Sequence, residues 1–273
     1  MSLPDGDRYT GMTSLLEHKN VIIYGAGGGL GSGVATTFAQ HGARLFLAGR
    51  TRDSLDAVAR DITAAGGTAE VAVIDALDEK AVETHIAGVV KRAGTLDVSF
   101  NLMTRGDVQG QPLLQMSADD FTRPVVNGLT GNFITARAAA RQMVSQGSGV
   151  ILSLTSGSSA GLAPMMGGTG PADAAMETFM RYLAAEVGPQ GVRVVGMWTA
   201  GVRETLTLEK LRAVGGENVP DPELVDQMIS GAAMLRRSPR LAQVAETAAF
   251  LASDRAAGIT ASIVNVTCGL VAR

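Results

Sequence analysis

The sequence is poor in the residues that build disulfides and metal centres. Its 273 residues include one cysteine, Cys268, and three scattered histidines, His18, His41 and His85. A single cysteine excludes an internal disulfide and is typical of a reducing compartment, and the histidine positions lack the spacing of metal ligands. The sequence therefore predicts neither a disulfide framework nor a metal site.

Charge and apolar length exclude two further classes of partner. The formal net charge of -3 at pH 7 offers no basic surface for nucleic acid or an anionic membrane. The uncharged stretches 20–43 and 142–172 are interrupted by glycine, serine and threonine, which disfavours a membrane span. The first residues lack the charged-then-apolar layout of a signal peptide. We therefore expect a cytoplasmic protein that binds a small molecule.

What the sequence does contain is a regular alternation of short apolar runs and helical patterns. Strands are predicted at 21–24, 43–48, 69–74, 96–101, 150–154, 192–197 and 262–266, and helices at 30–40, 54–65, 79–92, 118–127, 127–143, 173–187 and 241–252. Strands alternating with helices predict an α/β protein with a doubly wound parallel sheet, the Rossmann fold. No linker-like tract interrupts the pattern, so we expect residues 14–273 to form a single domain. Residues 1–13 are expected to be a disordered or expression-derived lead-in.

A glycine-rich segment joins the first predicted strand to the first predicted helix. Glycines permit a tight turn there and let the backbone approach the pyrophosphate of a dinucleotide, which rests against free amides at the start of the helix. We predict that Gly25, Gly29, Leu30 and Gly31 bind such a cofactor. A glycine-rich connection without a ligand is the alternative.

Motifs along most of the chain are similar to those of the short-chain dehydrogenase/reductase family. The glycine segment resembles the family's Thr-Gly-x-x-x-Gly-x-Gly, with Tyr24 in place of the threonine, and the run 149–156 resembles its strand that ends in the catalytic serine. The resemblance extends from about residue 15 to residue 271. It implies that Ser156 contacts a substrate oxygen and that Asn127 supports a proton-relay water. The alternatives are a turn-forming serine cluster and a helix cap or kink beside Gly128.

The family's catalytic Tyr-x-x-x-Lys is absent. Thirteen positions after Ser156, the family's usual spacing, the chain has Thr169, and Asp173 stands in the place of the lysine. An aliphatic hydroxyl stays protonated at physiological pH, and an aspartate opposes loss of a proton nearby. We therefore predict that the tyrosine-based proton transfer is impaired or replaced at Thr169 and Asp173. Asp173 also has the alternatives of acting as a carboxylate acid or base, or of being a favourable charge at a helix start.

Three residues at or just after the ends of predicted strands are candidates for binding the cofactor. By resemblance, Arg50 occupies the place where relatives that prefer NAD present an acidic residue, and a guanidinium there suits a 2′-phosphate. We therefore expect NADP(H) more than NAD(H). Asp75 resembles the residue that contacts adenine, with a helix cap as its alternative, and Asn101 is the first residue of the family's Asn-Asn-Ala-Gly.

Departures from the family pattern gather where relatives hold the nicotinamide. The Asn-Asn-Ala-Gly motif continues here as Leu102, Met103 and Thr104, and the family's Pro-Gly becomes Thr199 and Ala200. The added bulk could prevent productive binding of any cofactor. Arg105 and Asp107 lie just beyond and are candidates for recognising a charged group, or for non-redox chemistry.

Three functions remain open from the sequence. The first is an oxidoreductase that acts on a carbonyl or alcohol with NADP(H). The second is a redox-inactive, nucleotide-binding regulatory or scaffold subunit, and the third is a lyase or isomerase on the same fold.

The family resemblance also implies a cover for the substrate and an oligomer. Residues 198–239 correspond to the substrate lid, and helices 127–143 and 173–187 correspond to those that pair subunits, so a homodimer or homotetramer is expected. Methionines in the expected cleft segments, among them Met165, Met166 and Met228, suit a bulky apolar substrate, with ordinary filling of the core as the alternative.

Overall fold

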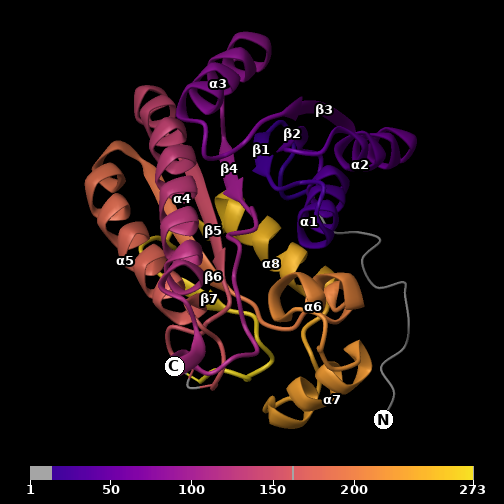
Figure 1. Cartoon of the computed structure of the whole chain (residues 1–273). Helices are drawn as coiled ribbons and strands as arrows, with labels where there is room; N and C mark the ends of the chain where they lie inside the picture. Colours follow the sequence, from indigo (N-terminus) through magenta and orange to yellow (C-terminus); the bar gives the residue numbers. More distant parts are fainter. Residues whose placement is uncertain (1–13, 162, 273) are drawn as a thin grey trace.

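The computed structural model describes residues 14–161 and 163–272. The lead-in predicted at residues 1–13 lies outside the described residues. A seven-stranded, entirely parallel sheet has the order β3-β2-β1-β4-β5-β6-β7 (Figure 1). The strands are β1 (Asn20–Tyr24), β2 (Arg44–Gly49), β3 (Thr68–Val73), β4 (Val98–Asn101), β5 (Gly149–Thr155), β6 (Val192–Trp198) and β7 (Ile263–Asn265). The predicted doubly wound α/β fold is confirmed.

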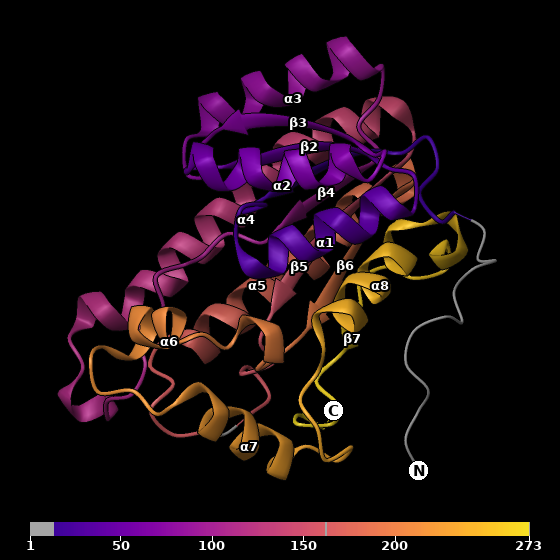
Figure 2. The ribbon, with the colours of Figure 1, turned by 90° about the vertical axis from the view of Figure 1, so that its right-hand side faces the viewer.

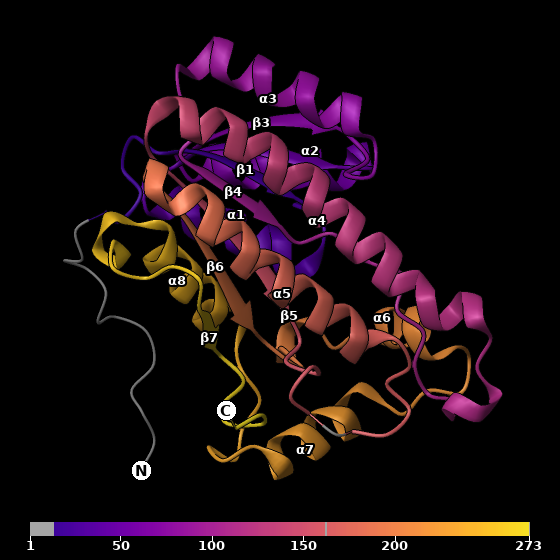
Figure 3. The same cartoon turned by 90° about the vertical axis from the view of Figure 1, so that its left-hand side faces the viewer.

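Helices cover both faces of this sheet. One face carries α1 (Gly29–Gln40), α2 (Arg52–Ala64) and α8 (Leu241–Ala252), and the other carries α3 (Glu79–Ala93), α4 (Ala118–Gln146) and α5 (Thr169–Val187), as Figures 1 and 3 show. Two buried apolar clusters fill the layers. Val34, Phe38 and Val244 belong to the first cluster, and Val82 and Met180 belong to the second. Burial of these clusters is the main favourable contribution to folding.

The long helix α4 corrects one prediction. The sequence predicted separate helices at 118–127 and 127–143, because Asn127 and Gly128 suggested a break. The structure has one helix, started by Ser117, whose hydroxyl accepts from the amide of Asp120 at 3.1 Å. The glycine serves packing instead, since a Cβ on Gly128 would lie 2.6 Å from Cδ of Arg105. The chain that follows β4 therefore runs close against α4.

Helix α5 also begins earlier than the predicted 173–187. It starts at Thr169 after Gly168, so that Thr169 and Asp173 lie on successive turns. Both side chains can thus approach the loops that follow β4 and β5. This placement brings the two substituted positions into one site.

The segment 198–239 lies at the end of the sheet where the strands finish. It contains α6 (Leu208–Gly215) and α7 (Pro222–Ala232), which lie below the sheet in Figure 2. The short turns are η1 (Leu113–Gln115), η2 (Gly188–Gln190), η3 (Arg203–Thr205) and η4 (Asp254–Ala256). Within the described residues, no helix combines the length and apolar character that a membrane crossing requires. The assignment of 198–239 as a lid and of one domain to 14–273 stays a prediction.

Candidate active site

The glycine loop between β1 and α1 has a shape that only glycine permits at two positions. Gly25 has a φ of 78°, and a Cβ there would lie 2.6 Å from the carbonyl oxygen of Leu102. A Cβ on Gly31 would lie 2.2 Å from the carbonyl oxygen of Gly25. The loop is therefore folded tightly against the end of β4. Leu30 packs its side chain against the core, so only its backbone is available to a ligand.

The first turn of α1 is open to an anion. The residue before it, Gly28, provides no side-chain cap, and the turn contains no acidic residue. The free amides of Gly29, Leu30 and Gly31 therefore lie at the positive end of the helix without a compensating group. This arrangement fits the phosphates of a nucleotide.

A groove of about 530 Å³ extends from this loop along the ends of β1 to β4. Arg50 and Asp75 both line it, together with Gly25, Gly28 and Asn127. Arg50 is exposed and has no hydrogen bond or ion pair among the described residues. The open groove, the uncapped helix and this unpaired guanidinium fit the adenosine and phosphate parts of a dinucleotide.

Two predicted cofactor residues hold the backbone of their own loops. Asp75 accepts from the amide of Leu77 at 3.0 Å, whereas Asp78 is the cap of α3, so the alternative reading of Asp75 as that cap is wrong. Asn101 is buried; its amide donates to Thr135 Oγ1 at 2.9 Å, and its Oδ1 accepts from the amide of Met103 at 3.0 Å. Asn101 therefore fixes the end of β4 and does not line the groove.

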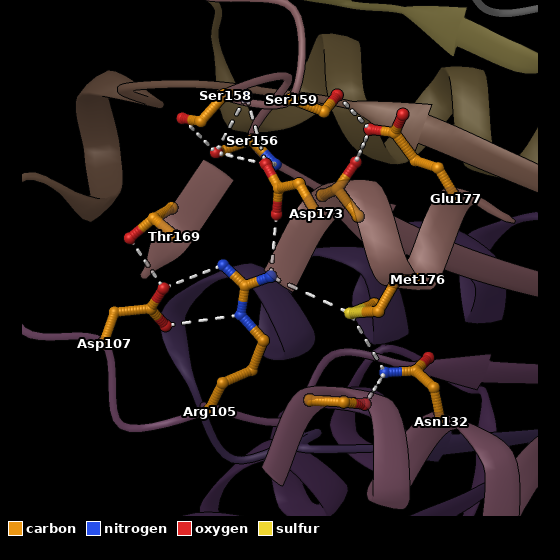
Figure 4. A network of polar contacts seen from close by, with 12 residues as sticks. Arg105, Asp107, Asn132, Ser156, Ser158, Ser159, Thr169, Asp173, Met176 and Glu177 are labelled. Atoms are coloured by element: carbon orange, nitrogen blue, oxygen red, sulfur yellow. Dashed lines mark hydrogen bonds and ion pairs between the residues drawn. The ribbon is translucent and has the colours of Figure 1, made fainter. Parts of the chain in front are cut away.

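The predicted catalytic residues meet in one polar network (Figure 4). Asp173 is fully buried, and its Oδ2 accepts from the amide of Ser156 at 3.0 Å, the hydroxyl of Ser156 at 2.7 Å and the amide of Ser158 at 3.1 Å. Its Oδ1 accepts from Nη1 of Arg105 at 2.7 Å. The interpretation of Asp173 as a first-turn helix charge is therefore wrong, because its carboxylate ties α5 to the loops after β4 and β5.

Arg105 is the centre of this network, a role that the sequence analysis missed. Its guanidinium contacts both oxygens of Asp107, at 2.9 and 3.3 Å, as well as Asp173. The hydroxyl of Thr169 donates to Oδ1 of Asp107 at 2.8 Å, and the amide of Asn127 donates to the carbonyl oxygen of Arg105 at 3.1 Å. Because each charge of Arg105 and Asp107 is satisfied internally, the pair is unsuited to recognising a charged ligand.

The charge of Arg105 changes the electrostatics that the sequence implied. Burial alone would lower the pKa of Arg105, but the carboxylates of Asp107 and Asp173 more than offset this, and the pKa is raised. The expected excess of negative charge at Asp173 is therefore partly cancelled. One cation and two carboxylates give the cluster a formal charge of -1.

A second buried carboxylate lies one turn further along α5. Oε1 of Glu177 accepts from the indole of Trp198 at 2.7 Å, from Ser159 Oγ at 2.7 Å and from Thr155 Oγ1 at 3.3 Å. The indole of Trp198 therefore points to α5, and its ring lies close to Gly157. Neither Glu177 nor the direction of the Trp198 ring was predicted.

Tyrosine does not enter the network from elsewhere in the described residues. Tyr182 is 70% exposed on α5, and Tyr24 is buried in β1, where its hydroxyl has no hydrogen-bond partner within residues 14–161 and 163–272. Burial raises the pKa of Tyr24, which makes its phenol a poorer proton donor than an exposed one. Tyr9 lies outside the described residues. The same described part of the chain holds no group of three or more His, Cys, Asp or Glu side chains arranged for a metal.

The parallel sheet, the glycine loop at its first crossover and the groove at the strand ends define a fold of the Rossmann type with a groove that fits a nucleotide. A family model described as enoyl-(acyl carrier protein) reductase matches residues 25–271. The chain is 31% identical to L-rhamnose 1-dehydrogenase (NAD(P)(+)) of Azotobacter vinelandii, over 94% of this chain and 98% of that protein. It is 26% identical to the 3-oxoacyl-[acyl-carrier-protein] reductase FabG of Chlamydia muridarum, over 95% and 100%.

Solved structures agree on the fold. Carveol dehydrogenase from Mycobacterium avium in complex with NAD matches with a TM-score of 0.85 at 22% identity, covering 94% of this chain and 99% of that one. NAD+-bound xylitol dehydrogenase matches with a TM-score of 0.83 at 24% identity, covering 93% and 99%. The chain belongs to the short-chain dehydrogenase/reductase family of oxidoreductases.

Proposed function

We propose that the chain binds NADP(H) in the groove and acts on a carbonyl or alcohol group without the tyrosine-based proton transfer of its family. The observation that carries this proposal is the closed network at the two substituted positions. Positions 169 and 173 provide neither a phenol nor an ammonium group. Thr169 donates a hydrogen bond to Asp107, and Asp173 accepts one from Arg105. The proposed oxidoreductase is therefore slow compared with relatives that have the tyrosine.

The roles of the individual side chains follow from their hydrogen bonds. When bound, NADP(H) supplies or accepts the hydride. The hydroxyl of Ser156 lies 2.7 Å from Asp173 Oδ2, and the hydroxyl of Thr169 lies 2.8 Å from Asp107 Oδ1, so each proton is directed at a carboxylate. Either hydroxyl must turn from its carboxylate before it can donate to a substrate oxygen. The final proton then comes from water, at a cost of roughly 10²- to 10⁴-fold in rate.

Loss of NADPH absorbance over a panel of aldehydes and ketones tests the proposal, together with direct NADPH binding on the same preparation. Binding with slow turnover is the expected result. Binding of NADPH with no turnover on any carbonyl would favour the redox-inactive subunit. In that case the hydrogen-bond network around Asp173 would have a purely structural role. A lyase or isomerase gains no support from the geometry, because Asp173 is fully buried and accepts from four donor groups.

Arg50 is expected to decide the cofactor preference. Arg50→Ala should raise the Kd for NADPH by roughly 10- to 100-fold and leave the Kd for NADH unchanged, because the lost contact is a charge-assisted bond to the 2′-phosphate. Calorimetric titration of both nucleotides measures this. Arg52→Ala is the matched control, since Arg52 is paired with Asp56 at 3.1 Å on the outer side of α2. An equal loss of affinity for NADPH and NADH would show that Arg50 does not bind the 2′-phosphate.

We also propose that the chain forms a homodimer or homotetramer through α4 and α5, which lie side by side on one outer face (Figure 3). Val126, Phe133 and Tyr182 are exposed there. Phe133→Glu/Tyr182→Glu is expected to reduce the mass in solution to that of the monomer, because two buried charges would oppose association. Light scattering after gel filtration measures the mass. Leu224→Glu on α7 is the control, and an unchanged mass in the double variant would exclude this face.

A further inference from the structure

The hydroxyl of Ser156 has no hydrogen-bonding capacity left for a substrate. A hydroxyl has one proton and two lone pairs. Its proton is donated to Oδ2 of Asp173, which as the ion-pair partner of Arg105 is a carboxylate and can only accept. The oxygen of Ser156 accepts from the amide of Ser158 at 3.3 Å and lies 2.7 Å from the hydroxyl oxygen of Ser158 (Figure 4). The proton of that last contact must therefore come from Ser158.

The hydroxyl of Thr169 is closed in the same way. Its side chain is buried, with 2% of the residue exposed. It donates to Oδ1 of Asp107 at 2.8 Å and accepts from Nε2 of Gln109 at 3.1 Å. Neither of the two hydroxyls that the sequence assigned to the reaction is thus free to contact a substrate.

Ser158 differs from both, because its oxygen is open. The residue is partly exposed, and no group of the described residues donates to its Oγ. Its proton is used by Ser156 and its amide by Asp173, so two lone pairs are what it offers to a ligand. A Cβ on Gly170 would lie 3.0 Å from its carbonyl oxygen, which places Ser158 beside the first turn of α5. This is the carboxyl edge of the sheet, where ligands of open α/β folds bind.

We propose that Ser158 is the residue that contacts the substrate, and that it accepts a hydrogen bond from the hydroxyl group of an alcohol. This proposal rests on the proposed oxidoreductase function and narrows its substrate class to alcohols. An alcohol carries the proton that Ser158 can accept. A carbonyl oxygen has only lone pairs, so it binds there only after Ser158 turns its proton away from Ser156 and gives up that hydrogen bond.

The same groups form a path for the proton of the alcohol. The carbinol carbon loses its hydride to bound NADP+, the O–H bond breaks, and the proton passes to Oγ of Ser158. The proton of Ser158 passes to Oγ of Ser156, and that of Ser156 passes to Oδ2 of Asp173, over two contacts of 2.7 Å. The alcohol is oxidised to the carbonyl compound, and NADP+ is reduced. The proton on Asp173 returns through the same hydroxyls to water after the product leaves.

Binding measurements test the preference for an alcohol without turnover. Tertiary alcohols have a hydroxyl but no hydrogen on the carbinol carbon, so they bind beside NADP+ without being oxidised. The probes are 2-phenylpropan-2-ol with acetophenone, and 2-methylbutan-2-ol with butan-2-one, which pair an alcohol with a ketone of similar shape. Calorimetric titration of the protein saturated with NADP+ is expected to show roughly 2- to 10-fold tighter binding of each alcohol, the usual contribution of one hydrogen bond.

Three variants separate this role from a general effect on the loop. Ser158→Ala is expected to remove the preference and to lower kcat for oxidation of 1-phenylethanol and butan-2-ol by roughly 10²-fold, the lower end of what acid–base catalysis contributes. Ser158→Thr keeps the hydroxyl and should retain both properties. Ser159→Ala is the matched control, because the hydroxyl of Ser159 donates to Glu177 at 2.7 Å, outside this path.

Two kinds of result would contradict the proposal. Ketones that bind the parent as tightly as the alcohols, or a parent-like preference and rate in Ser158→Ala, would overturn the role of Ser158 while leaving cofactor binding intact. An equal effect of Ser159→Ala would overturn it as well, since the change would then belong to the loop. Failure of the parent to bind NADP+, or to convert any alcohol or ketone of the panel, would instead overturn the proposed function, and this inference with it.

Discussion

Replacing Arg105 by alanine is expected to lower the free energy of unfolding by about 3–5 kcal/mol, which is the usual cost of removing one partner of a buried ion pair. The variant leaves Asp173, whose side chain is fully buried, without its cation. It also removes the guanidinium that binds Asp107, whose side chain is only 15% exposed. Urea denaturation with an unchanged m-value measures the difference.

A surface ion pair provides the control for this prediction. Arg141 contacts Glu83 at 2.9 Å, but the two side chains are 64% and 43% exposed, so Arg141→Ala should cost less than about 1 kcal/mol. Arg105→Ala/Asp173→Asn should be more stable than Arg105→Ala alone, because asparagine removes the fully buried charge at position 173. A loss below about 1 kcal/mol in Arg105→Ala would show that the network contributes little to the fold.

The second large effect is a gain of catalysis. Thr169→Tyr/Asp173→Lys restores the family's pair, but the new lysine would face the guanidinium of Arg105, and like charges would oppose both folding and the intended tuning of the phenol. The double variant is therefore expected to stay slow. Adding Arg105→Ala should raise kcat/KM for NADPH-dependent carbonyl reduction by roughly 10²- to 10⁴-fold, the usual contribution of general acid catalysis.

A phenylalanine version isolates the phenol hydroxyl. Thr169→Phe/Asp173→Lys/Arg105→Ala has nearly the same bulk and the same charge as the tyrosine variant but no proton to transfer, so it should gain nothing. Steady-state rates are compared after NADPH binding has been measured for each variant. If the tyrosine variant binds NADPH and still does not turn over, the altered residues at the nicotinamide end, Leu102, Met103 and Thr104, limit the reaction instead.

The sequence was sufficient for the fold because the sheet has a strong periodic signal. The apolar run of β1 leads into the glycine loop at Gly25, and that of β5 lies between Gly147 and Gly157; the buried patterns of both strands match the prediction. The predicted ends of the helices were less accurate. A helix cap or kink was considered at Asn127 beside Gly128, whereas α4 continues through both residues and the space beside Gly128 is filled by Arg105. Such a contact between distant residues leaves no periodic trace in the sequence.

The sequence identified most residues of the site, but it did not predict the hydrogen bonds and ion pairs that join them. The family resemblance placed Ser156, Thr169 and Asp173 in one site, and the structure brings them into one network. The pairing of Asp173 with Arg105 joins residues 68 positions apart and depends on the direction of a long side chain, which spacing does not give. One signal was available: a carboxylate on the apolar face of a buried helix requires a cation, and Arg105 follows the neighbouring strand.

The ion pair between Arg105 and Asp173 restricts the routes by which this site can change. Substitution of Asp173 by lysine alone would place a second positive charge beside Arg105. Substitution of Arg105 by a neutral residue alone would leave the buried carboxylate of Asp173 without its cation. Either single substitution therefore gives a less stable protein. The two positions should therefore vary together among descendants of this chain. An acidic residue at the lysine position of any relative then indicates where to look for its basic counterpart, at the start of the loop that follows the fourth strand.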